Sequence, residues 1–493
     1  MRKLIQSKKG KKQNPLEKSS KEHWLNTELL LFALLAIILV LSASMIARLI
    51  QSKPMLAAGE SYYNLRIAQE LRTKPFISQD PIQSTPYELN PYHYFLALLL
   101  MIFPPDSVPV FLPLLTGVIS AMVFFQILLF LGFKHKTAAY SLFIFAVTPA
   151  FIRLFTGLYT AGFVILLSLM IIFLMLSTKK SKFILTLCIL LFILLALTSL
   201  TGLAATVLII LMLCLVLHRK IKLLFIPATP TIIMMAALAI FTKYTLRFTG
   251  FHAFDFKFFL SVLNAEIGFD LFLLVLFFIG FFVLWAKQEQ KRLLHMAAMA
   301  FLFLSLFNST SRAFFSFVIT IYCVFGITYL YNRKWELEVI RSGTLLLVLC
   351  SLVFSATNEI NLVVNSQPDQ EMQNALLFLK GLSTGRILTT EANGFMVEFY
   401  AAKSALVDPN AALLQNYSAA QKDMNDLFRS VRLTDAEPII QKYNIDYFLI
   451  TPDMKEELWE NRDKGLWFLL KHSNSFIKKY DSAGIEIWEY GPA

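Results

Sequence analysis

Charged side chains are scarce in this 493-residue sequence. Asp, Glu, Lys and Arg make up 16% of it, whereas 57% of the residues are hydrophobic and Phe alone occurs 46 times. No soluble domain needs so much apolar surface. The composition therefore excludes a soluble globular protein and predicts a polytopic α-helical membrane protein.

Cysteine is rare, and the common catalytic motifs are absent. The four cysteines, Cys188, Cys214, Cys323 and Cys350, all fall inside apolar runs, so none is left for a disulfide outside the membrane. The sequence has no zinc-ligand spacing, phosphate-binding glycine loop, nucleophile elbow or dinucleotide fingerprint. The few polar residues of the membrane region are therefore the informative ones.

The N-terminal tail is strongly basic. Residues 1–22 contain eight Lys and Arg against two acids. Because an apolar run follows at once, the positive-inside rule explains this charge better than nucleic-acid binding does, and it predicts a cytoplasmic tail. The run 28–50 is too long for a signal-peptide core and is interpreted as an uncleaved signal anchor.

Apolar runs and basic turns together predict about eleven membrane spans. The turns that this count places inside are all basic, and the outside turns at 157–160, 199–203 and 308–312 are short and nearly uncharged. An odd number of spans puts the C-terminal residues outside. The predicted spans lie near 28–50, 108–133, 137–156, 160–178, 183–199, 203–217, 222–242, 269–286, 293–308, 313–331 and 343–357.

The composition changes after the last span. Residues 366–493 hold 18 acids and 13 bases, a balance opposite in sign to that of the predicted cytoplasmic parts. Short β-rich runs at 386–390, 405–407, 447–451 and 485–490 alternate with helical runs such as 370–382 and 434–443, which predicts a small α/β domain. The expected organisation is a cytoplasmic tail 1–26, a transmembrane domain 27–357 with an external loop 51–107, and an external domain 358–493.

The long external loop opens with a carboxylate directly before a predicted helix. Ser61 can cap that helix, and Tyr63, Ile67 and Leu71 recur at a spacing of four, which gives an apolar stripe suited to a membrane surface. A carboxylate held there beside aromatic side chains suits catalysis, so Glu60 is the first catalytic candidate. The alternative is a solvated Glu in a loop.

Later in the same loop, the apolar run 91–103 is too short to cross a membrane. It predicts an interfacial or re-entrant helix. Asp80 and His93 are substrate-binding candidates on this loop, although a packed interfacial ring is the more common role for such a His.

Three further charged residues fall on the same predicted face. Arg153 lies near the outer end of a span, Arg312 in the turn 308–312, and Glu266 in the outside loop 261–268. Together with Glu60 they place two acids and two bases on one side of the membrane. The alternatives are snorkelling of each Arg to lipid headgroups and helix-start capping by Glu266.

This arrangement resembles the membrane glycosyltransferases that use polyprenol-linked sugars, the C-type glycosyltransferase fold. The likeness is specifically to the catalytic subunit of archaeal and bacterial oligosaccharyltransferase, and it covers most of the chain. Residues 60–66, ESYYNLR, match the family's acid, aromatics and Arg-containing helix in the first external loop, with Glu for the usual Asp. In the second external loop the chain keeps Arg153, Gly157 and Tyr159.

The resemblance also shows where this chain departs from the family. Thr160-Ala161-Gly162 stands where the family has an acidic pair. Residues 387–394, ILTTEANG, occupy the place of the family's Trp-Trp-Asp-Tyr-Gly motif, which recognises the acceptor sequon, so protein N-glycosylation is not the implied reaction. By position in the family, Glu266 corresponds to a catalytic loop Glu and Arg312 to a phosphate-contacting Arg. The substrate-binding candidates are Tyr63, Asp80, His93, Tyr159, Glu391 and Asn393.

The expected function is transfer of a sugar or glycan from a polyprenyl-phosphate or pyrophosphate carrier to an unidentified protein or glycan acceptor on the extracytoplasmic face. Glu60 and Glu266 are the catalytic candidates, and Arg312 and Arg153 would bind the donor phosphate. The cofactor is either none or a divalent Mn or Mg cation, with Glu60 and Glu266 as its ligands. A degenerate scaffold of the same fold and a lipid or solute transporter are the alternatives. The expected partners are the donor lipid and the bilayer, not nucleic acid, and the expected location is the cell membrane.

Overall fold

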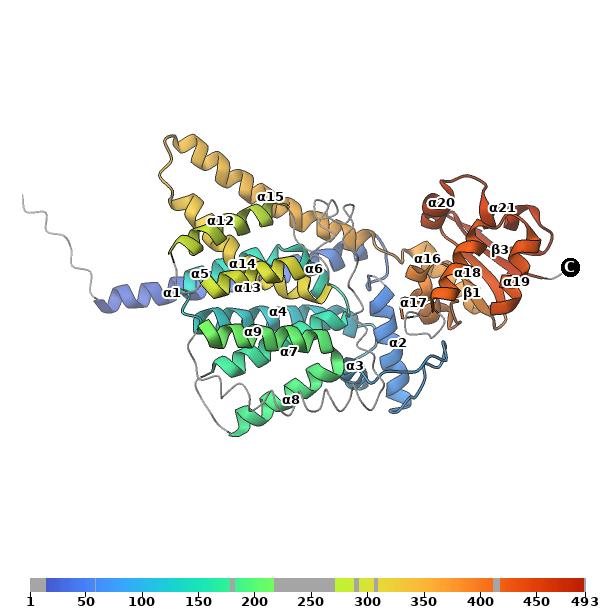
Figure 1. Cartoon of the computed structure of the whole chain (residues 1–493), viewed down its shortest axis with the longest axis horizontal. Helices are drawn as coiled ribbons and strands as arrows, with labels where there is room; N and C mark the ends of the chain where they lie inside the picture. The colour runs from blue at the N-terminus through green and yellow to red at the C-terminus, as the bar shows by residue number, and fades with distance from the viewer. Residues whose placement is uncertain are drawn as a thin grey trace, which may run out of the picture.

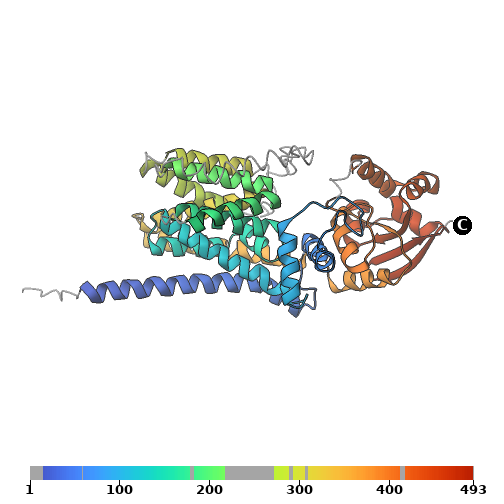
Figure 2. The same ribbon diagram turned by 90° about the horizontal axis from the view of Figure 1, so that it is seen from below.

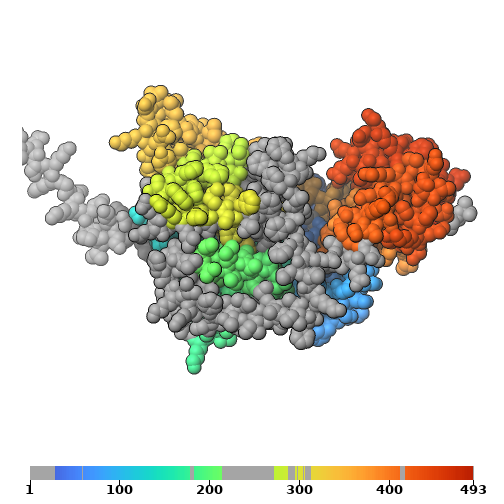
Figure 3. All heavy atoms as spheres, in the orientation of Figure 1, coloured from blue at the N-terminus to red at the C-terminus, as the bar shows by residue number. Residues whose placement is uncertain are grey.

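The computed structural model describes residues 15–57, 59–177, 182–216, 271–287, 292–305, 309–410 and 417–491. Long helices run beside one another (Figures 1 and 2). The C-terminal residues form a lobe at one end of them, which the space-filling view also shows (Figure 3). The helices of the first region are α1 (Pro15–Ile50), α2 (Gly59–Thr73), α3 (Pro91–Ile102), α4 (Val108–Phe130), α5 (His135–Ala146), α6 (Pro149–Phe155), α7 (Thr160–Leu176), α8 (Lys182–Thr198), α9 (Leu200–Val216), α12 (Leu271–Lys287), α13 (Arg292–Ser305), α14 (Ser309–Asn332) and α15 (Glu338–Asn365).

Within the described residues, four helices are long and apolar enough to cross a membrane, or five spans result if the bent pair α5–α6 counts as one. The four lie in α1, α4 and α14 and in the stretch that begins with α15. Each predicted span in the described part of the chain falls on a helix, several of them shorter than a full span. The span predicted at 222–242 lies outside the described residues, and the total of eleven stays a prediction.

The span predicted at 137–156 is not one straight helix. It is the pair α5 and α6, which meet at an angle of 71°. Pro149 begins α6, and a proline both removes a helical N–H donor and disfavours helical backbone in the residue before it. The bend matters for the site because α6 carries Arg153 and packs against α15.

The loop 51–107, predicted to be external, contains two short helices that lie at the ends of the long ones. In Figures 1 and 2, α2 runs across the helix bundle, between the long helices and the C-terminal lobe. Asn90 caps α3 by accepting a hydrogen bond from the Tyr92 N–H (3.0 Å), so α3 starts where the sequence predicts. The Tyr92 ring packs on Phe163 of α7 with centroids 5.1 Å apart, which fixes the loop onto the bundle.

A buried arginine joins the ends of α1 and α15. Arg48 is 1% exposed and donates hydrogen bonds to six backbone carbonyls, at 2.7–3.2 Å. They belong to Pro54 and Leu56 after α1 and to Val363, Val364, Ser366 and Pro368 at the end of α15. The carbonyls compensate the buried charge and anchor the chain just before α2 begins.

The C-terminal lobe contains a four-stranded mixed sheet in the order β1-β2-β4-β3. The strands are β1 (Arg386–Leu388), β2 (Ile445–Ile450), β3 (Phe476–Ser482) and β4 (Ile485–Tyr490), of which β1 and β2 are parallel and the other pairs antiparallel. The described helices are α16 (Gln370–Lys380), η3 (Glu391–Asn393), α17 (Gly394–Met396), η4 (Val397–Ala401), α18 (Tyr417–Arg429), α19 (Leu433–Tyr443), α20 (Pro452–Trp459) and α21 (Gly465–His472).

Three of the four predicted strand runs become strands of this sheet. The run 405–407 does not, because Ala405 makes only an isolated bridge to Ile387. Strand β3 was not predicted. Its residues between Phe476 and Ser482 are mostly exposed, with Lys478, Lys479 and Asp481 among them, so its apolar alternation is weak.

Candidate functional site

Glu60 lies in the first turn of α2 and faces the start of α7. Its Oε1 accepts a hydrogen bond from the backbone N–H of Thr160 at 3.0 Å. Burial raises the pKa of the Glu60 carboxyl, and the Thr160 hydrogen bond partly offsets that effect. The carboxyl is thus held at a helix N-terminus, where an anionic form is favoured, in a site that is poorly hydrated.

Two more side chains of α2 hold the turn between α6 and α7. The Ser61 hydroxyl accepts from the Leu158 N–H at 3.0 Å, and the Asn64 amide donates to the Leu158 carbonyl at 2.7 Å. Both backbone groups of Leu158 are therefore bound by one helix. Gly157 permits the close approach, because a Cβ there would lie 2.8 Å from the Ser61 hydroxyl oxygen and 2.6 Å from the Tyr159 ring.

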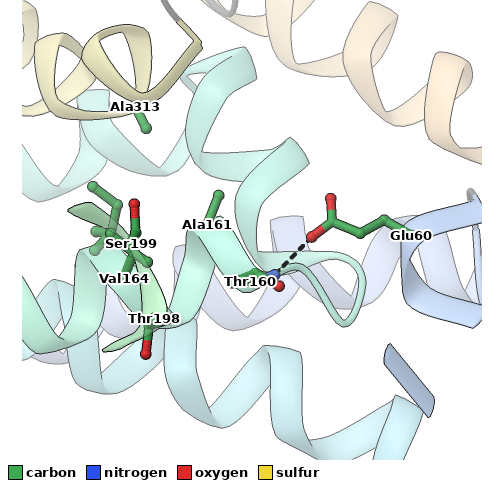
Figure 4. Close-up of a pocket in the computed structure, with 8 residues that line it drawn as sticks. Glu60, Thr160, Ala161, Val164, Thr198, Ser199 and Ala313 are labelled. Carbon is green, nitrogen blue, oxygen red and sulfur yellow. Dashed lines mark hydrogen bonds between the residues drawn. The ribbon is translucent and has the colours of Figure 1, made fainter. Parts of the chain in front are cut away.

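A cavity of about 230 Å³ opens beside Glu60. In Figure 4, Glu60 approaches it from α2, with Thr160 and Ala161 of α7 next to it and Ala313 of α14 on another wall. Thr198, Ser199, Val164 and Ile165 complete the lining. Helices α2, α7 and α9 begin beside this cavity, and α8 ends there. The positive ends of three helix dipoles and the negative end of one therefore lie near the cavity, and its walls are mostly apolar.

The two predicted cations lie close enough for their charges to interact, and their environments differ. Arg153 donates from Nε to Glu359 Oε1 at 2.8 Å and from Nη2 to Oε2 at 3.1 Å. Glu359 of α15 is 1% exposed at its side chain, whereas the Arg153 side chain is 44% exposed. Arg312 is half-buried, in the residue before Ala313, and the positive charge of Arg153 acts on it. The pairing with Glu359 offsets much of the Arg153 charge, which weakens Arg153 as a phosphate candidate.

Tyr63, His93 and Asp80 are not among the residues that line the cavity. Tyr63 stacks on Phe395 of α17 with centroids 4.7 Å apart and presents an edge contact to His93. His93 is 2% exposed, and burial, helped by the charge of Arg66, lowers its pKa to about 3. It is a packed neutral ring, the more common role for a histidine in such a loop.

Asp80 is part of a buried ionic cluster that joins the first loop to the C-terminal lobe. Arg66 donates to both Asp80 oxygens at 2.8 and 2.6 Å and to Glu398 Oε2 at 2.7 Å. Burial alone would raise the pKa of Asp80, but the Arg66 hydrogen bonds and charge outweigh it and lower the pKa. Asp80 therefore holds Arg66, and no described contact aims it at the cavity beside Glu60.

Of the remaining predicted site residues that the structure describes, two lie in the C-terminal lobe and one lies at the start of α7. Glu391 accepts a hydrogen bond from the Tyr417 hydroxyl at 3.1 Å, and Asn393 donates to Thr389 and Thr390 of its own segment. The segment that carries them reaches the start of α2, because a Cβ on Gly59 would lie 3.5 Å from the Ala392 carbonyl oxygen. Glu266 lies outside the described residues. Tyr159 occupies the N-cap position of α7, between Leu158 and Thr160.

Several residues of the site were missed from the sequence. Asn64 sits four residues after Glu60 on the same helix face, a spacing that could have indicated it. Glu359 lies two residues beyond the predicted span 343–357, because α15 continues to Asn365, and a lone carboxylate at the end of an apolar helix usually marks a paired group. Glu398 gave no local signal, because its partner Arg66 lies 332 positions away, and Asp408 interacts with Glu398.

The fold is that of the C-type membrane glycosyltransferases, as solved structures show. The apo oligosaccharyltransferase of Archaeoglobus fulgidus superposes with a TM-score of 0.64 at 13% identity, covering 96% of this chain and 75% of that one. The same enzyme, AglB, in complex with an inhibitory peptide and a dolichol-phosphate, gives 0.62 at 13% identity over 96% and 74%. ArnT of Cupriavidus metallidurans bound to undecaprenyl phosphate gives 0.57 at 12% identity over 95% and 100%. No protein-family model and no curated protein matches this chain.

A divalent cation does not find a full ligand set among the described residues. Another structure of the archaeal enzyme was determined with Zn and sulfate. In the part of this chain that the structure describes, no group of three or more His, Cys, Asp or Glu side chains could hold a metal ion. Among the residues that the structure describes, Glu60 is the one carboxylate that lines the cavity, with the Thr160 hydroxyl beside it. Mn and Mg prefer several oxygen ligands, so this donor set does not fit them by itself.

Proposed function

We propose that this protein is a membrane glycosyltransferase that moves a sugar or glycan from a polyprenyl-phosphate or pyrophosphate carrier to an acceptor at the outer membrane face. The observation that supports this most is the cavity that Glu60 and the start of α14 share, at the ends of the long helices. The fold adds support, because two solved proteins that share it bind dolichol-phosphate and undecaprenyl phosphate.

In the proposed reaction, Glu60 accepts the proton of an acceptor hydroxyl or orients that group for attack on the sugar's anomeric carbon. The new bond joins the acceptor oxygen to this carbon, and the bond from the carbon to the carrier phosphate breaks. The phosphate leaves with both bonding electrons. Arg312, with the positive helix ends beside the cavity, would stabilise its growing negative charge. The polyprenyl chain would remain in lipid beside the apolar walls.

A catalytically degenerate scaffold is the second candidate. The observation that favours it is the single carboxylate on the cavity wall, which leaves the described site with few groups for chemistry. The two candidates differ in one measurable property, the turnover of donor lipid.

The test is donor consumption by the purified full-length chain in detergent, with a panel of synthetic polyprenyl-phosphate sugars. Glu60→Gln should lower turnover by about 10²-fold or more while donor binding survives, because the amide keeps size but cannot accept a proton. Arg312→Ala should weaken both binding and turnover, since the phosphate loses a cationic partner.

The matched controls are Glu88→Gln in the same loop and Arg429→Ala in the C-terminal lobe, both at exposed positions. They should leave turnover unchanged. If Glu60→Gln and Arg312→Ala consume donor at the wild-type rate, the chemistry is located elsewhere. If the wild type binds donor but consumes none of the panel, the protein is a catalytically degenerate scaffold and the proposal of an enzyme is wrong.

A further inference from the structure

A chain of hydrogen bonds leads from the interior of the first loop to the turn that contacts Glu60. The Tyr87 hydroxyl lies 3.0 Å from His93 Nδ1, and His93 Nε2 lies 2.8 Å from Asn64 Oδ1. Asn64 Nδ2 then reaches the Leu158 carbonyl at 2.7 Å, with the Thr160 hydroxyl at 3.4 Å and Glu60 Oε1 at 3.5 Å. Asn64 and His93 are 1% and 2% exposed, so this chain is shielded from water.

The direction of each hydrogen bond follows from chemistry. The Asn64 amide nitrogen must face the Leu158 carbonyl, because a carbonyl can only accept. The amide oxygen therefore faces His93, which must carry its proton on Nε2. The other ring nitrogen, Nδ1, then accepts from the Tyr87 hydroxyl. One tautomer of a neutral ring satisfies all three groups.

The His93 ring has little freedom to leave this orientation. Tyr63 contacts it edge-on at 5.6 Å and Tyr87 stacks on it at 5.8 Å between centroids. Asn90 caps the helix that carries it. The ring, held in place on α3, therefore fixes the orientation of the Asn64 amide. Asn64 in turn fixes the position of the Leu158–Thr160 backbone.

We infer that Asn64 and His93 are positioning residues for Glu60. His93, in its Nε2–H tautomer, orients the Asn64 amide, which holds the turn that presents the Thr160 N–H to the Glu60 carboxylate. This rests on the proposed function of Glu60 but makes a separate claim about geometry. Neither residue touches the cavity, so neither should contribute to donor binding.

The first experiment compares Asn64→Leu, His93→Phe and His93→Gln in donor turnover. Asn64→Leu removes the amide at similar size, and His93→Phe keeps a ring but loses the donor. Both should lower kcat by about tenfold to 10²-fold with KM nearly unchanged, because misplacement of a catalytic group affects the reacting geometry. His93→Gln retains an N–H near the Nε2 position and should recover most of the rate. Asn361→Leu, at an exposed site on α15, is the matched control and should match the wild type.

The second experiment does not depend on activity. Nitrogen-15 NMR of the histidine-labelled protein reports which ring nitrogen is protonated, and His93→Gln assigns the resonance among the seven histidines. The Nε2–H tautomer is expected in the wild type, and Asn64→Leu should change the His93 signal. An Nδ1–H or doubly protonated ring in the wild type would overturn the inference, as would equal losses in His93→Gln and His93→Phe. If no donor is consumed but the tautomer is as expected and responds to Asn64→Leu, the proposed function fails and the positioning geometry stands.

Discussion

Gly157 sets how closely α2 can approach the turn before α7. A Cβ at this position would lie within 3 Å of both the Ser61 hydroxyl oxygen and the Tyr159 ring, so one side must move. Ser61 binds the Leu158 N–H, and Tyr159 lies between Leu158 and Thr160, whose N–H binds Glu60. A single methyl group here therefore acts on the site through its geometry and leaves its charge unchanged.

Gly157→Ala should lower donor turnover by about tenfold or more and destabilise the protein by about 1–3 kcal/mol. The measurements are turnover in detergent and thermal unfolding. Gly343→Ala on α15 is the matched control, because a Cβ there meets nothing within 4 Å and Ala favours a helix by about 1 kcal/mol. A Gly157→Ala protein with wild-type rate and stability would show that the α2 contact is loose.

At this scale the sequence could reveal residues but not their partners. Glu60 was identifiable because it is an acid at a helix start just after a predicted span. Its partner Thr160 lies 100 positions away, and Glu359 lies 206 positions from Arg153. Nothing in local composition encodes such pairings, since they depend on how the helices pack. Arg153 was therefore expected to be available to phosphate, and the structure shows it bound to a buried carboxylate.

Among the elements, the contact between α2 and the C-terminal lobe depends on a shared proton. Arg66 of α2 binds Asp80 and Glu398, and Glu398 also interacts with Asp408. Burial raises the pKa of Glu398 well above its usual range; Arg66 lowers it and the Asp408 charge raises it again. Burial also raises the pKa of Asp408. Arg66 thus binds two carboxyls, and the third, Asp408, interacts with Glu398. The raised pKa values indicate that the folded state favours a proton at the Glu398–Asp408 pair.

The stability of this contact should fall as the pH rises. The folded state binds the shared proton more tightly than the unfolded chain does, so its contribution is complete below the ordinary Glu pKa of 4.5 and is lost as pH rises through the raised value. Asp408→Asn replaces the proton-dependent contact with an amide that needs no added proton. It should flatten the decline of the melting temperature with pH.

The control for this prediction is Asp426→Asn, an exposed change of the same type on α18. It should leave the wild-type pH profile of the melting temperature in place. A wild-type profile with no decline above pH 4.5, or an Asp408→Asn profile of the same slope, would contradict the shared-proton interpretation.

How well the elements could be predicted depended on how much local signal each carried. Helix α3 and strands β2 and β4 had clear apolar runs and appear within a few residues of their predicted bounds. The bend between α5 and α6 was missed because its apolar run continues unbroken, although Pro149 was a visible breaker. Strand β3 is stabilised by pairing with β4, and its own charged residues gave no strand pattern.

At the scale of the whole molecule, the start of α1 and the C-terminal lobe lie at opposite ends of the helix bundle (Figures 1 and 2). The turns predicted to be cytoplasmic are basic, and the lobe predicted to be external is acidic. This difference in charge agrees with the positive-inside rule. The cavity beside Glu60 is at the lobe's end of the bundle. Topology therefore decides whether the proposed reaction takes place outside the cell, where a flipped polyprenol carrier would present its sugar.

Cysteines at two exposed positions test this orientation directly. Ser418→Cys lies on α18 in the C-terminal lobe, and Lys136→Cys lies at the start of α5, in a turn predicted to be cytoplasmic. An impermeant thiol reagent should label residue 418 in intact cells and residue 136 only after lysis, with the modified peptides identified by mass spectrometry. The native cysteines serve as an internal reference, because they lie in apolar segments and should react little under either condition. Labelling of residue 136 in intact cells, or of residue 418 only after lysis, would invert the topology and place the Glu60 cavity on the cytoplasmic side. In that case the donor would be a carrier lipid whose sugar faces the cytoplasm. The proposed reaction would then take place before the carrier lipid is moved across the membrane.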